Sequence, residues 1–230
     1  MVAALNEENS IGHVIANAKE NIKNADVLVV DGYSRDKTVE VALQNGAVVI
    51  KMDKFFGIGG AVEAGILYAY RNRYNYFVRI DADGQHRPAE MMDMINVIKN
   101  NTADFVIGSR FLGDSDYRPN LLRHSGIFLI SSLLHLLYKI KVYDCTSGCQ
   151  LYNRAVIEFF VQDNRFEYSE VRAIWVAHKA GFRIVESFLN MAPRTHGSSS
   201  FSSLNAFLYM FKNIADIIFS TPVFIRRRKR

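Results

Sequence analysis

Short apolar runs that end in polar turns constrain the fold of this chain more than any other feature. Residues 26–30, 47–50, 76–80 and 105–107 are rich in β-branched and aromatic side chains and have the length of strands. Longer amphipathic stretches separate them. This alternation predicts an α/β fold with a mostly parallel central sheet flanked by helices.

Three of these runs lead directly into polar, loop-forming sequence. Two of the polar segments begin at Asp31 and Asp81, and the third ends at Arg110. In α/β sheets, ligands bind beyond the carboxyl ends of the strands. We therefore expect these side chains to collect at one edge of the sheet.

The strongest local signal is the sequence Asp-Ala-Asp-Gly-Gln at residues 81–85. The carboxylates of Asp81 and Asp83 and the amide oxygen of Gln85 are hard ligands suited to one divalent cation. Such a cation would neutralise a diphosphate and stabilise it as a leaving group. A solvated acidic turn explains the pattern if it is taken alone.

Two weaker signals accompany this motif. Asp31 ends a predicted strand, where acidic residues bond the nucleobase or ribose in nucleotide-binding folds, although a turn aspartate is an equal explanation. Residues 57–61, which include Gly59, lead into a helix predicted to end near residue 70. Glycines permit close approach of the backbone, and the helix N-terminus favours phosphate, although a flexible turn would have the same composition.

The charge and cysteine content narrow the class of protein. The net charge of +5 comes entirely from the last five residues, since the other 225 carry 23 basic and 23 acidic side chains. Nucleic-acid binding is therefore not expected, because it requires basic residues spread over a face. Cys145 and Cys149 lack the further ligands of a zinc site and are expected to be reduced thiols of a cytosolic protein. No signal peptide or ordinary transmembrane helix is predicted.

Helices are predicted over residues 121–139 and 169–180, the second capped by Gly181. From residue 201 onward, polar residues recur every three or four positions, as in an amphipathic helix. That helix could cover the core, but the basic tail favours an anchor at a membrane interface. We therefore expect a catalytic domain over residues 1–200 and a membrane-interface helix with a basic tail over residues 201–230. Residues 127–137 could be a second helix that dips into the interface.

Seven short segments follow one another in a distinctive order: AALNEE at 3–8, VVDGYSRDKT at 29–38, GIGGAVEAG at 57–65, DADGQHRP at 81–88, GSR at 108–110, DCTSG at 144–148 and RTHGSS at 194–199. Together they resemble the motifs of glycosyltransferase family 2, in its branch of dolichyl-phosphate and polyprenyl-phosphate sugar synthases. The resemblance extends from residue 3 to about residue 200. It implies the nucleotide-diphospho-sugar transferase fold called GT-A.

The resemblance also implies roles for individual residues. Leu5, Glu7 and Asp31 would surround the base and ribose of the donor, with Gly59 near it; Asp81, Asp83 and Gln85 would hold Mg²⁺ or Mn²⁺ on its diphosphate; Arg110 and Arg194 would face phosphates. The guanidinium fork suits that last role. Arg123 is a weaker candidate for the acceptor phosphate, and a solvated helix charge explains it equally well.

The chain departs from the family pattern at several positions. The first strand has few residues before its motif, Gly32 stands where a second aspartate is common, and Ile58 replaces a frequent lysine. The late loop has Ser198-Ser199 in place of the usual Ser-Lys, which favours bacterial relatives. We therefore expect donor contacts that differ in detail.

The expected function is inverting transfer of a sugar from a nucleotide-diphosphate donor, UDP being favoured, to a polyprenyl phosphate. The protein would act as a peripheral enzyme on the cytoplasmic face of the membrane, and association into homo-oligomers is left open. One alternative is transfer to a hydroxyl of a lipid-linked saccharide, which needs a general base; Asp144, Glu167 and Glu170 are the candidates. Another is a non-catalytic partner subunit of the same fold.

Overall fold

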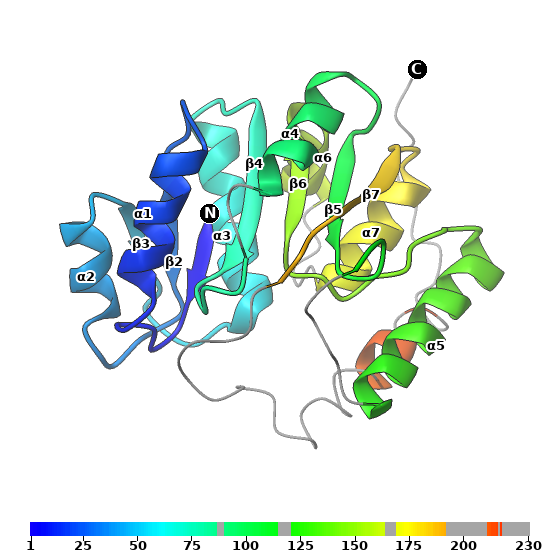
Figure 1. The fold of residues 1–230 in the computed structure, drawn as a ribbon, viewed down its shortest axis with the longest axis horizontal. Helices are drawn as coiled ribbons and strands as arrows, with labels where there is room; N and C mark the ends of the chain where they lie inside the picture. The colour runs from blue at the N-terminus through cyan, green and yellow to red at the C-terminus, as the bar shows by residue number, and fades with distance from the viewer. Residues whose placement is uncertain (87–89, 115–120, 164–168, 192–210, 216, 218–230) are drawn as a thin grey trace.

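The computed structural model describes residues 1–86, 90–114, 121–163, 169–191, 211–215 and 217 (Figure 1). In chain order, its elements are β1 (Val2–Ala4), α1 (Ile11–Asn21), β2 (Leu28–Asp31), α2 (Thr38–Gln44), β3 (Val48–Lys51), α3 (Gly57–Arg71), β4 (Tyr76–Asp81), α4 (Met91–Lys99), β5 (Phe105–Ser109), α5 (Leu121–Tyr138), β6 (Gln150–Asn153), α6 (Arg154–Asp163), α7 (Glu170–Lys179) and β7 (Ile184–Phe188). The predicted alternation of strands and helices is thus confirmed.

The strands form one seven-stranded sheet with the order β3-β2-β1-β4-β6-β5-β7. β6 is antiparallel to both of its neighbours, whereas the other pairs are parallel. The sheet is therefore mostly parallel, as the sequence predicts. β1 has only three residues but lies between β2 and β4 in the interior of the sheet (Figure 1).

Two hydrophobic cores cover the two faces of the sheet. Strand β5 shows how the chain serves both: Phe105 and Ile107 point into one core and Val106 into the other, and all three are fully buried. The first core receives α3, α5, α6 and α7, and the second receives α1 and α4. Alternation along a strand buried on both faces explains why the run is apolar throughout.

Helix α7 begins and ends where the sequence places it. Ser169 is its N-cap, and the Oγ atom of Ser169 accepts a hydrogen bond from the backbone N–H of Arg172. Gly181 has a φ of 89°, in the left-handed region that glycine adopts without strain. The strands β6 and β7, by contrast, were not predicted, because the apolar alternation is weak after Arg110.

Most of the predicted membrane-interface segment, residues 201–230, lies outside the described residues. Residues 211–215 are helical. Asn213 and Ile217 are buried against the body: Ser169 Oγ donates to Asn213 Oδ1 at 3.0 Å, and Tyr138 donates to the carbonyl of Ile217 at 2.6 Å. Phe211 is exposed. This part of the chain therefore lies beside α5 (Figure 1).

Candidate functional site

The carboxyl ends of β1, β2, β4 and β5 meet at one edge of the sheet. Because β6 runs in the opposite direction, the segment that precedes it reaches the same edge. Arg79 on β4 pairs with Gln150 on β6, which places Gly148 next to Asp81. A methyl group added at Gly148 would lie only 2.5 Å from Asp81 Oδ2. Two of the predicted motifs, residues 81–88 and 144–148, are thus in contact.

Asp81 and Asp83 follow one another around the turn that leaves β4. Asp83 is buried, and its Oδ1 atom accepts a hydrogen bond from the backbone N–H of Gln85 at 3.1 Å. Gly84, between Asp83 and Gln85, has a φ of 75°, which allows the backbone to turn tightly there. The side chain of Asp81 is 40% exposed. One oxygen of Asp83 is therefore fixed by the turn, and the carboxylate of Asp81 is open to a ligand.

The electrostatic surroundings of Asp81 keep it ionised. Burial works to raise the pKa of its carboxyl, but the adjacent His86 ring and the charges of Arg79 and Arg110 outweigh burial and lower this pKa to about 2. A deprotonated carboxylate is the form that binds a hard cation.

Asp31 ends β2 at the same edge and is completely buried. Its Oδ2 atom accepts a hydrogen bond from the backbone N–H of Ser34, but within the described ranges its Oδ1 atom has no partner. A buried carboxylate oxygen without a donor is costly, by about 1–3 kcal/mol or more for a charged group. The position therefore suits a ligand that brings an N–H or O–H group.

The loops that follow β1 and β2 are bound to each other. The backbone N–H of Asn6 donates to Ser34 Oγ at 2.8 Å, and Asn6 Oδ1 accepts from the backbone N–H of Arg35 at 2.9 Å. Leu5 is 38% exposed beside Asp31 and Gly32. These hydrogen bonds hold the two loops together beside Asp31.

Glu7 lies in the loop that follows β1, but its carboxylate already has a structural partner. Its Oε2 atom accepts a hydrogen bond from Ser10 Oγ at 2.6 Å, just before α1 begins. The backbone N–H of Glu7 donates to Thr38 Oγ1 at 2.7 Å. The structure therefore ties Glu7 to the first turn of α1 and to the start of α2.

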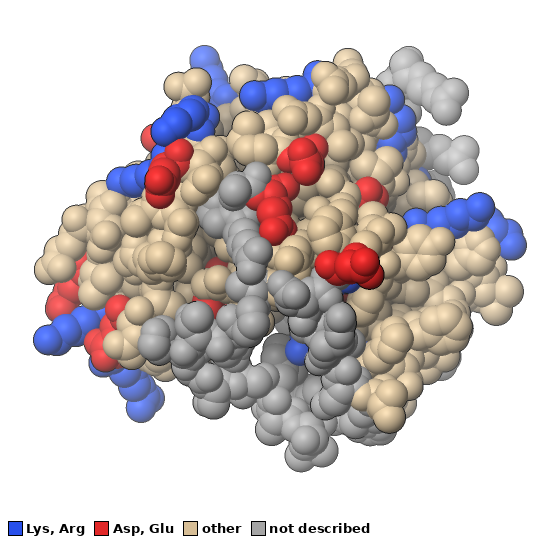
Figure 2. Space-filling model, in the orientation of Figure 1, with Lys and Arg blue, Asp and Glu red and all other residues tan. Residues whose placement is uncertain are grey.

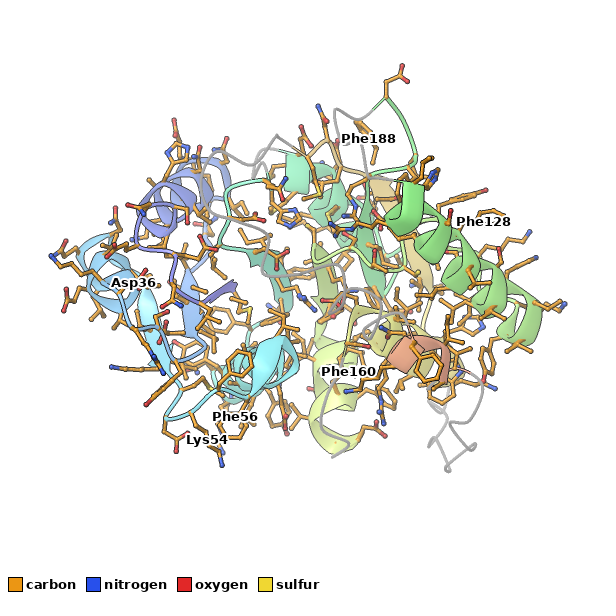
Figure 3. All side chains as sticks on the ribbon, turned by 90° about the horizontal axis from the view of Figure 1, so that it is seen from below. Asp36, Lys54, Phe56, Phe128, Phe160 and Phe188 are labelled. Carbon is orange, nitrogen blue, oxygen red and sulfur yellow. The ribbon has the colours of Figure 1, made fainter. Side chains whose placement is uncertain are left out.

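The glycine-rich segment forms the first turn of α3 rather than a loop before it. Gly57 has a φ of 70° and opens the helix, and Gly59 lies within the first turn. Its N-cap residue, Phe56, makes no side-chain capping hydrogen bond, so the backbone N–H groups at this end suit an anion. Phe56 is 49% exposed here, and Lys54 lies over its ring at 4.8 Å from the centroid (Figure 3).

Arg110 leaves β5 and pairs with the loop before β6. Its Nε and Nη2 atoms donate to the two carboxylate oxygens of Asp144, and Nη2 also donates to Thr146 Oγ1 at 3.1 Å. Glu186 holds the loop in turn, accepting from the backbone N–H groups of Tyr143 and Asp144 at 2.8 Å each. Burial raises the pKa of the Glu186 carboxyl.

The carboxylates that could serve as a general base are occupied where the structure describes them. Asp144 is fully buried against Arg110, and Glu170 accepts from Arg79 Nη2 at 2.6 Å with little exposure. Neither is placed to take a proton from a substrate. Glu167 lies outside the described residues, as does Arg194, whereas Arg123 is exposed on the first turn of α5.

Several partners at this edge have no signal in the sequence. Gly148 against Asp81, the pair Arg79–Glu170 and the contacts of Glu186 join residues that are far apart along the chain. Pairings of this kind follow from the order of strands in the sheet, which the sequence did not predict. Among the residues that contact the acidic motif, His86 is the one that the sequence comes closest to indicating, because it directly follows that motif.

The residues at the end of β4 fit a divalent cation that takes some of its ligands from the protein and others from a bound diphosphate. Within the part of the chain that the structure describes, no group of three or more His, Cys, Asp and Glu side chains could hold a metal ion alone. Asp81 and Asp83 would supply two carboxylates and Gln85 an amide oxygen. Cations such as Mg²⁺ commonly take their other ligands from water and substrate phosphates.

Comparison with known proteins agrees with this geometry. The family model for glycosyl transferase family 2 matches residues 1–160, and the chain belongs to that family. The polyprenol monophosphomannose synthase of Mycolicibacterium smegmatis is 27% identical over 222 residues, covering 92% of this chain and 83% of that protein. The UDP-N-acetylglucosamine–dolichyl-phosphate N-acetylglucosaminyltransferase of Methanococcus voltae is 26% identical over 206 residues, covering 81% and 82%.

A solved structure shares the fold. It is glucosyl-3-phosphoglycerate synthase from Mycobacterium tuberculosis, crystallised with Mn²⁺ and UDP-glucose. The TM-score is 0.69 with 17% identity, over 95% of this chain and 76% of that one. The expected GT-A fold is thus confirmed, and the relatives named for polyprenol and dolichyl-phosphate acceptors support the resemblance to that branch of family 2.

Proposed function

We propose that the protein transfers a sugar, with inversion, from a nucleotide diphosphate to a polyprenyl phosphate at a membrane surface. One observation carries the donor half of this proposal. The partnerless Oδ1 atom of Asp31 and the carboxylates of Asp81 and Asp83 lie at the same edge of the sheet. The first accepts an N–H group of the base, and the others hold a cation on the diphosphate.

UDP is the nucleotide that we favour. Uracil presents an N–H group between two carbonyls, which a carboxylate oxygen can accept. The structural neighbour glucosyl-3-phosphoglycerate synthase is crystallised with UDP-glucose and Mn²⁺. Mg²⁺ or Mn²⁺ would neutralise the departing diphosphate when bound. The N-terminus of α3, with Gly59 in its first turn, is a further place for a donor phosphate.

A phosphate acceptor fits the finding that the two candidate bases in the described part of the chain, Asp144 and Glu170, are both paired with arginines. A phosphate monoester has a second pKa of about 6, so it is mostly ionised at neutral pH and needs no side chain to remove a proton. Its oxygen forms the new bond to the sugar C1 atom while the bond from C1 to the diphosphate breaks, the electron pair leaving with the nucleotide. The relatives from Mycolicibacterium and Methanococcus are named for polyprenol and dolichyl-phosphate acceptors.

Helix α5 supplies a surface for the lipid. Its outer face carries the exposed side chains Leu121, Phe128, Leu129, Leu136 and Leu137, whereas Ile127, Ile130 and Leu134 pack into the core. Phe128 points away from the body in Figure 3, and the surface over α5 shows few charges in Figure 2. No helix in the described parts of the chain is long and apolar enough to cross a membrane. Attachment to one membrane surface is the arrangement that we propose.

The lipid-facing helix is linked to the site by direct contacts. Phe111, next to Arg110, stacks on His124 of α5 with ring centroids 5.5 Å apart. Ser131 of α5 donates to the carbonyl of Tyr143 at 3.3 Å, next to Asp144. A polyprenyl chain held along α5 would therefore present its phosphate near Arg110 and Arg123.

The test is transfer of labelled sugar from a panel of nucleotide sugars to undecaprenyl phosphate in phospholipid vesicles. We expect a product with wild-type protein, a loss of at least about 100-fold with Asp83→Ala, and the same loss with excess chelator. Asp26→Ala, far from the edge, is the matched control and should retain activity. Undiminished turnover in chelator would refute the metal-dependent mechanism.

The same assay separates the alternatives. Product formed only with a lipid-linked saccharide would favour transfer to a hydroxyl and a base outside the described residues. Absence of both products, together with absence of UDP binding, would favour a non-catalytic subunit.

A further inference from the structure

His86 is a buried polar side chain that the fold does not explain. The side chain is 2% exposed, and neither ring nitrogen has a hydrogen-bond partner among the residues that the structure describes. Its backbone forms an antiparallel bridge with Met191, so the position of the ring is tied to the end of β7. Leaving a buried polar group unpaired costs about 1–3 kcal/mol. An apolar residue would fill this space without that cost.

The ring lies against the open carboxylate of the acidic motif. His86 Nε2 is 3.5 Å from Asp81 Oδ2, slightly longer than the 2.7–3.2 Å of an ordinary N–H···O bond. Gly148, in the segment just before β6, faces the same oxygen. The Asp81 side chain is 40% exposed and the His86 side chain almost wholly covered, so His86 approaches from the protein side and leaves the solvent side of Asp81 open.

We propose that His86 is a positioning residue for the cation site, donating a hydrogen bond from Nε2–H to Asp81 Oδ2. The other oxygen of Asp81 is then directed towards the cation. This inference rests on the proposed function, because it requires that Asp81 bind a metal. Carboxylates that ligate metals are themselves hydrogen-bonded by such partners, and removing the partner typically lowers metal affinity 10- to 100-fold.

The burial of His86 favours positioning over direct ligation. A ligand to the metal must reach the open side of the site, where Asp81 is exposed and the nucleotide diphosphate would enter. The His86 ring is almost wholly covered and approaches the carboxylate from the protein side instead. The role assigned to its Nε2 atom also requires the tautomer that carries hydrogen there.

The experiment compares two substitutions by Mn²⁺ titration in the presence of UDP. His86→Phe keeps a flat ring but has no N–H group, whereas His86→Gln keeps an N–H donor at a similar reach. We expect His86→Phe to weaken Mn²⁺ binding about 10- to 100-fold and His86→Gln to restore most of the affinity. UDP binding without metal should be unchanged in both, and thermal melting establishes that each is folded. His86→Leu replaces the phenylalanine variant if that variant does not fold.

Three results would overturn the inference. Wild-type Mn²⁺ affinity in His86→Phe would show that the ring does not act on the site. Equal losses in the Phe and Gln variants would assign His86 a packing role. Coupling of a ring nitrogen to Mn²⁺ in the electron paramagnetic resonance of wild-type protein, which needs no variant, would make His86 a ligand. Failure of the proposed function is distinct: wild-type protein would then bind no Mn²⁺ with UDP, or would bind it equally well after Asp83→Ala.

Discussion

Arg110 and Asp144 form a two-pronged ion pair in which the Nε–Oδ2 and Nη2–Oδ1 distances are both 2.6 Å. The two residues are 4% and 0% exposed. The backbone N–H of Arg110 also donates to Asp144 Oδ2 at 3.0 Å. The pair joins the end of β5 to the loop before β6, and it fixes the guanidinium that we place near the acceptor phosphate.

Asp144→Asn should therefore destabilise the protein strongly. Removing one charge of a buried pair leaves the other uncompensated, which lowers the free energy of unfolding by about 3 kcal/mol. Urea denaturation measures this. The control is Glu158→Gln, which breaks the half-exposed pair of Glu158 with Arg154 and should cost about 0.5 kcal/mol or less. Equal, small losses in both variants would contradict the assignment of Arg110 as a buried, paired charge.

Gly148→Ala should damage cation binding more than stability. The added methyl group would lie 2.5 Å from Asp81 Oδ2, so the carboxylate must move. We expect Mn²⁺ affinity in the presence of UDP to fall by at least about 10-fold, by the sensitivity of metal sites to ligand orientation. Gly12→Ala is the control, because its methyl group would meet the side-chain amide of Asn45 at 3.1 Å, far from the site. Unchanged affinity in Gly148→Ala would show that Asp81 is not a ligand.

Asp31→Asn tests the nucleobase contact. The amide retains the shape of the carboxylate, but its charge is lost and its NH₂ group cannot accept a hydrogen bond. A hydrogen bond to a charged group is worth about 1.5–3 kcal/mol, so the Kd for UDP should rise roughly 10- to 100-fold. Calorimetry with UDP measures the change, and kcat at saturating donor should fall much less. An unchanged Kd would remove Asp31 from the donor site.

The two thiols should be nearly inert in the native protein. Burial is the main cause that raises the pKa of Cys145 and of Cys149 to about 12. At pH 8 almost no thiolate is present, so alkylation by iodoacetamide should be at least about 100-fold slower than in urea-unfolded protein. The native rate should continue to rise with pH above 9, because these thiols are still protonated there. A rate that levels off near pH 9 would contradict the raised pKa values.

Replacing apolar side chains on the outer face of α5 should weaken membrane attachment. Each large side chain contributes about 1.5–3 kcal/mol when fully buried, so Phe128→Ser with Leu136→Ser should reduce binding to anionic phospholipid vesicles by at least about 10-fold. Turnover with a short, soluble acceptor should be retained. Leu43→Ser, at an exposed position of α2, is the matched control for flotation. Equal flotation of all three proteins would refute α5 as the lipid-facing surface.

The parallel strands were predictable because each is an apolar run that ends in a polar turn. β4, for example, is predicted over residues 76–80 and observed over Tyr76–Asp81. The same rule predicts that Asp31 and Asp81 lie at one edge, as the parallel pairing of β2 and β4 with β1 confirms. β6 was missed because only four residues, Gln150–Asn153, separate a turn-rich segment from α6, and two of the four are polar.

The contacts between motifs were beyond the reach of the sequence. Asp144 is a plausible base by residue type, and only the structure shows that Arg110 occupies both of its oxygens. Glu170 was a candidate for the same reason and is paired with Arg79, which the strand pattern marks only as a buried cation. Local sequence carries residue type and strand position, whereas pairing across 34 or 91 positions depends on the order of strands in the sheet.

The antiparallel β6 also sets the order in which the sheet can be completed during synthesis. The strands that β5 pairs with, β6 and β7, both come later in the chain. β4 likewise keeps one side unpaired until residues 150–153 have left the ribosome. A nascent chain that ends after β5 contains the strands of the nucleotide side of the sheet, but it has no Gly148 beside Asp81 and no Asp144 beside Arg110. The donor half is thus synthesised before the residues that complete the catalytic edge.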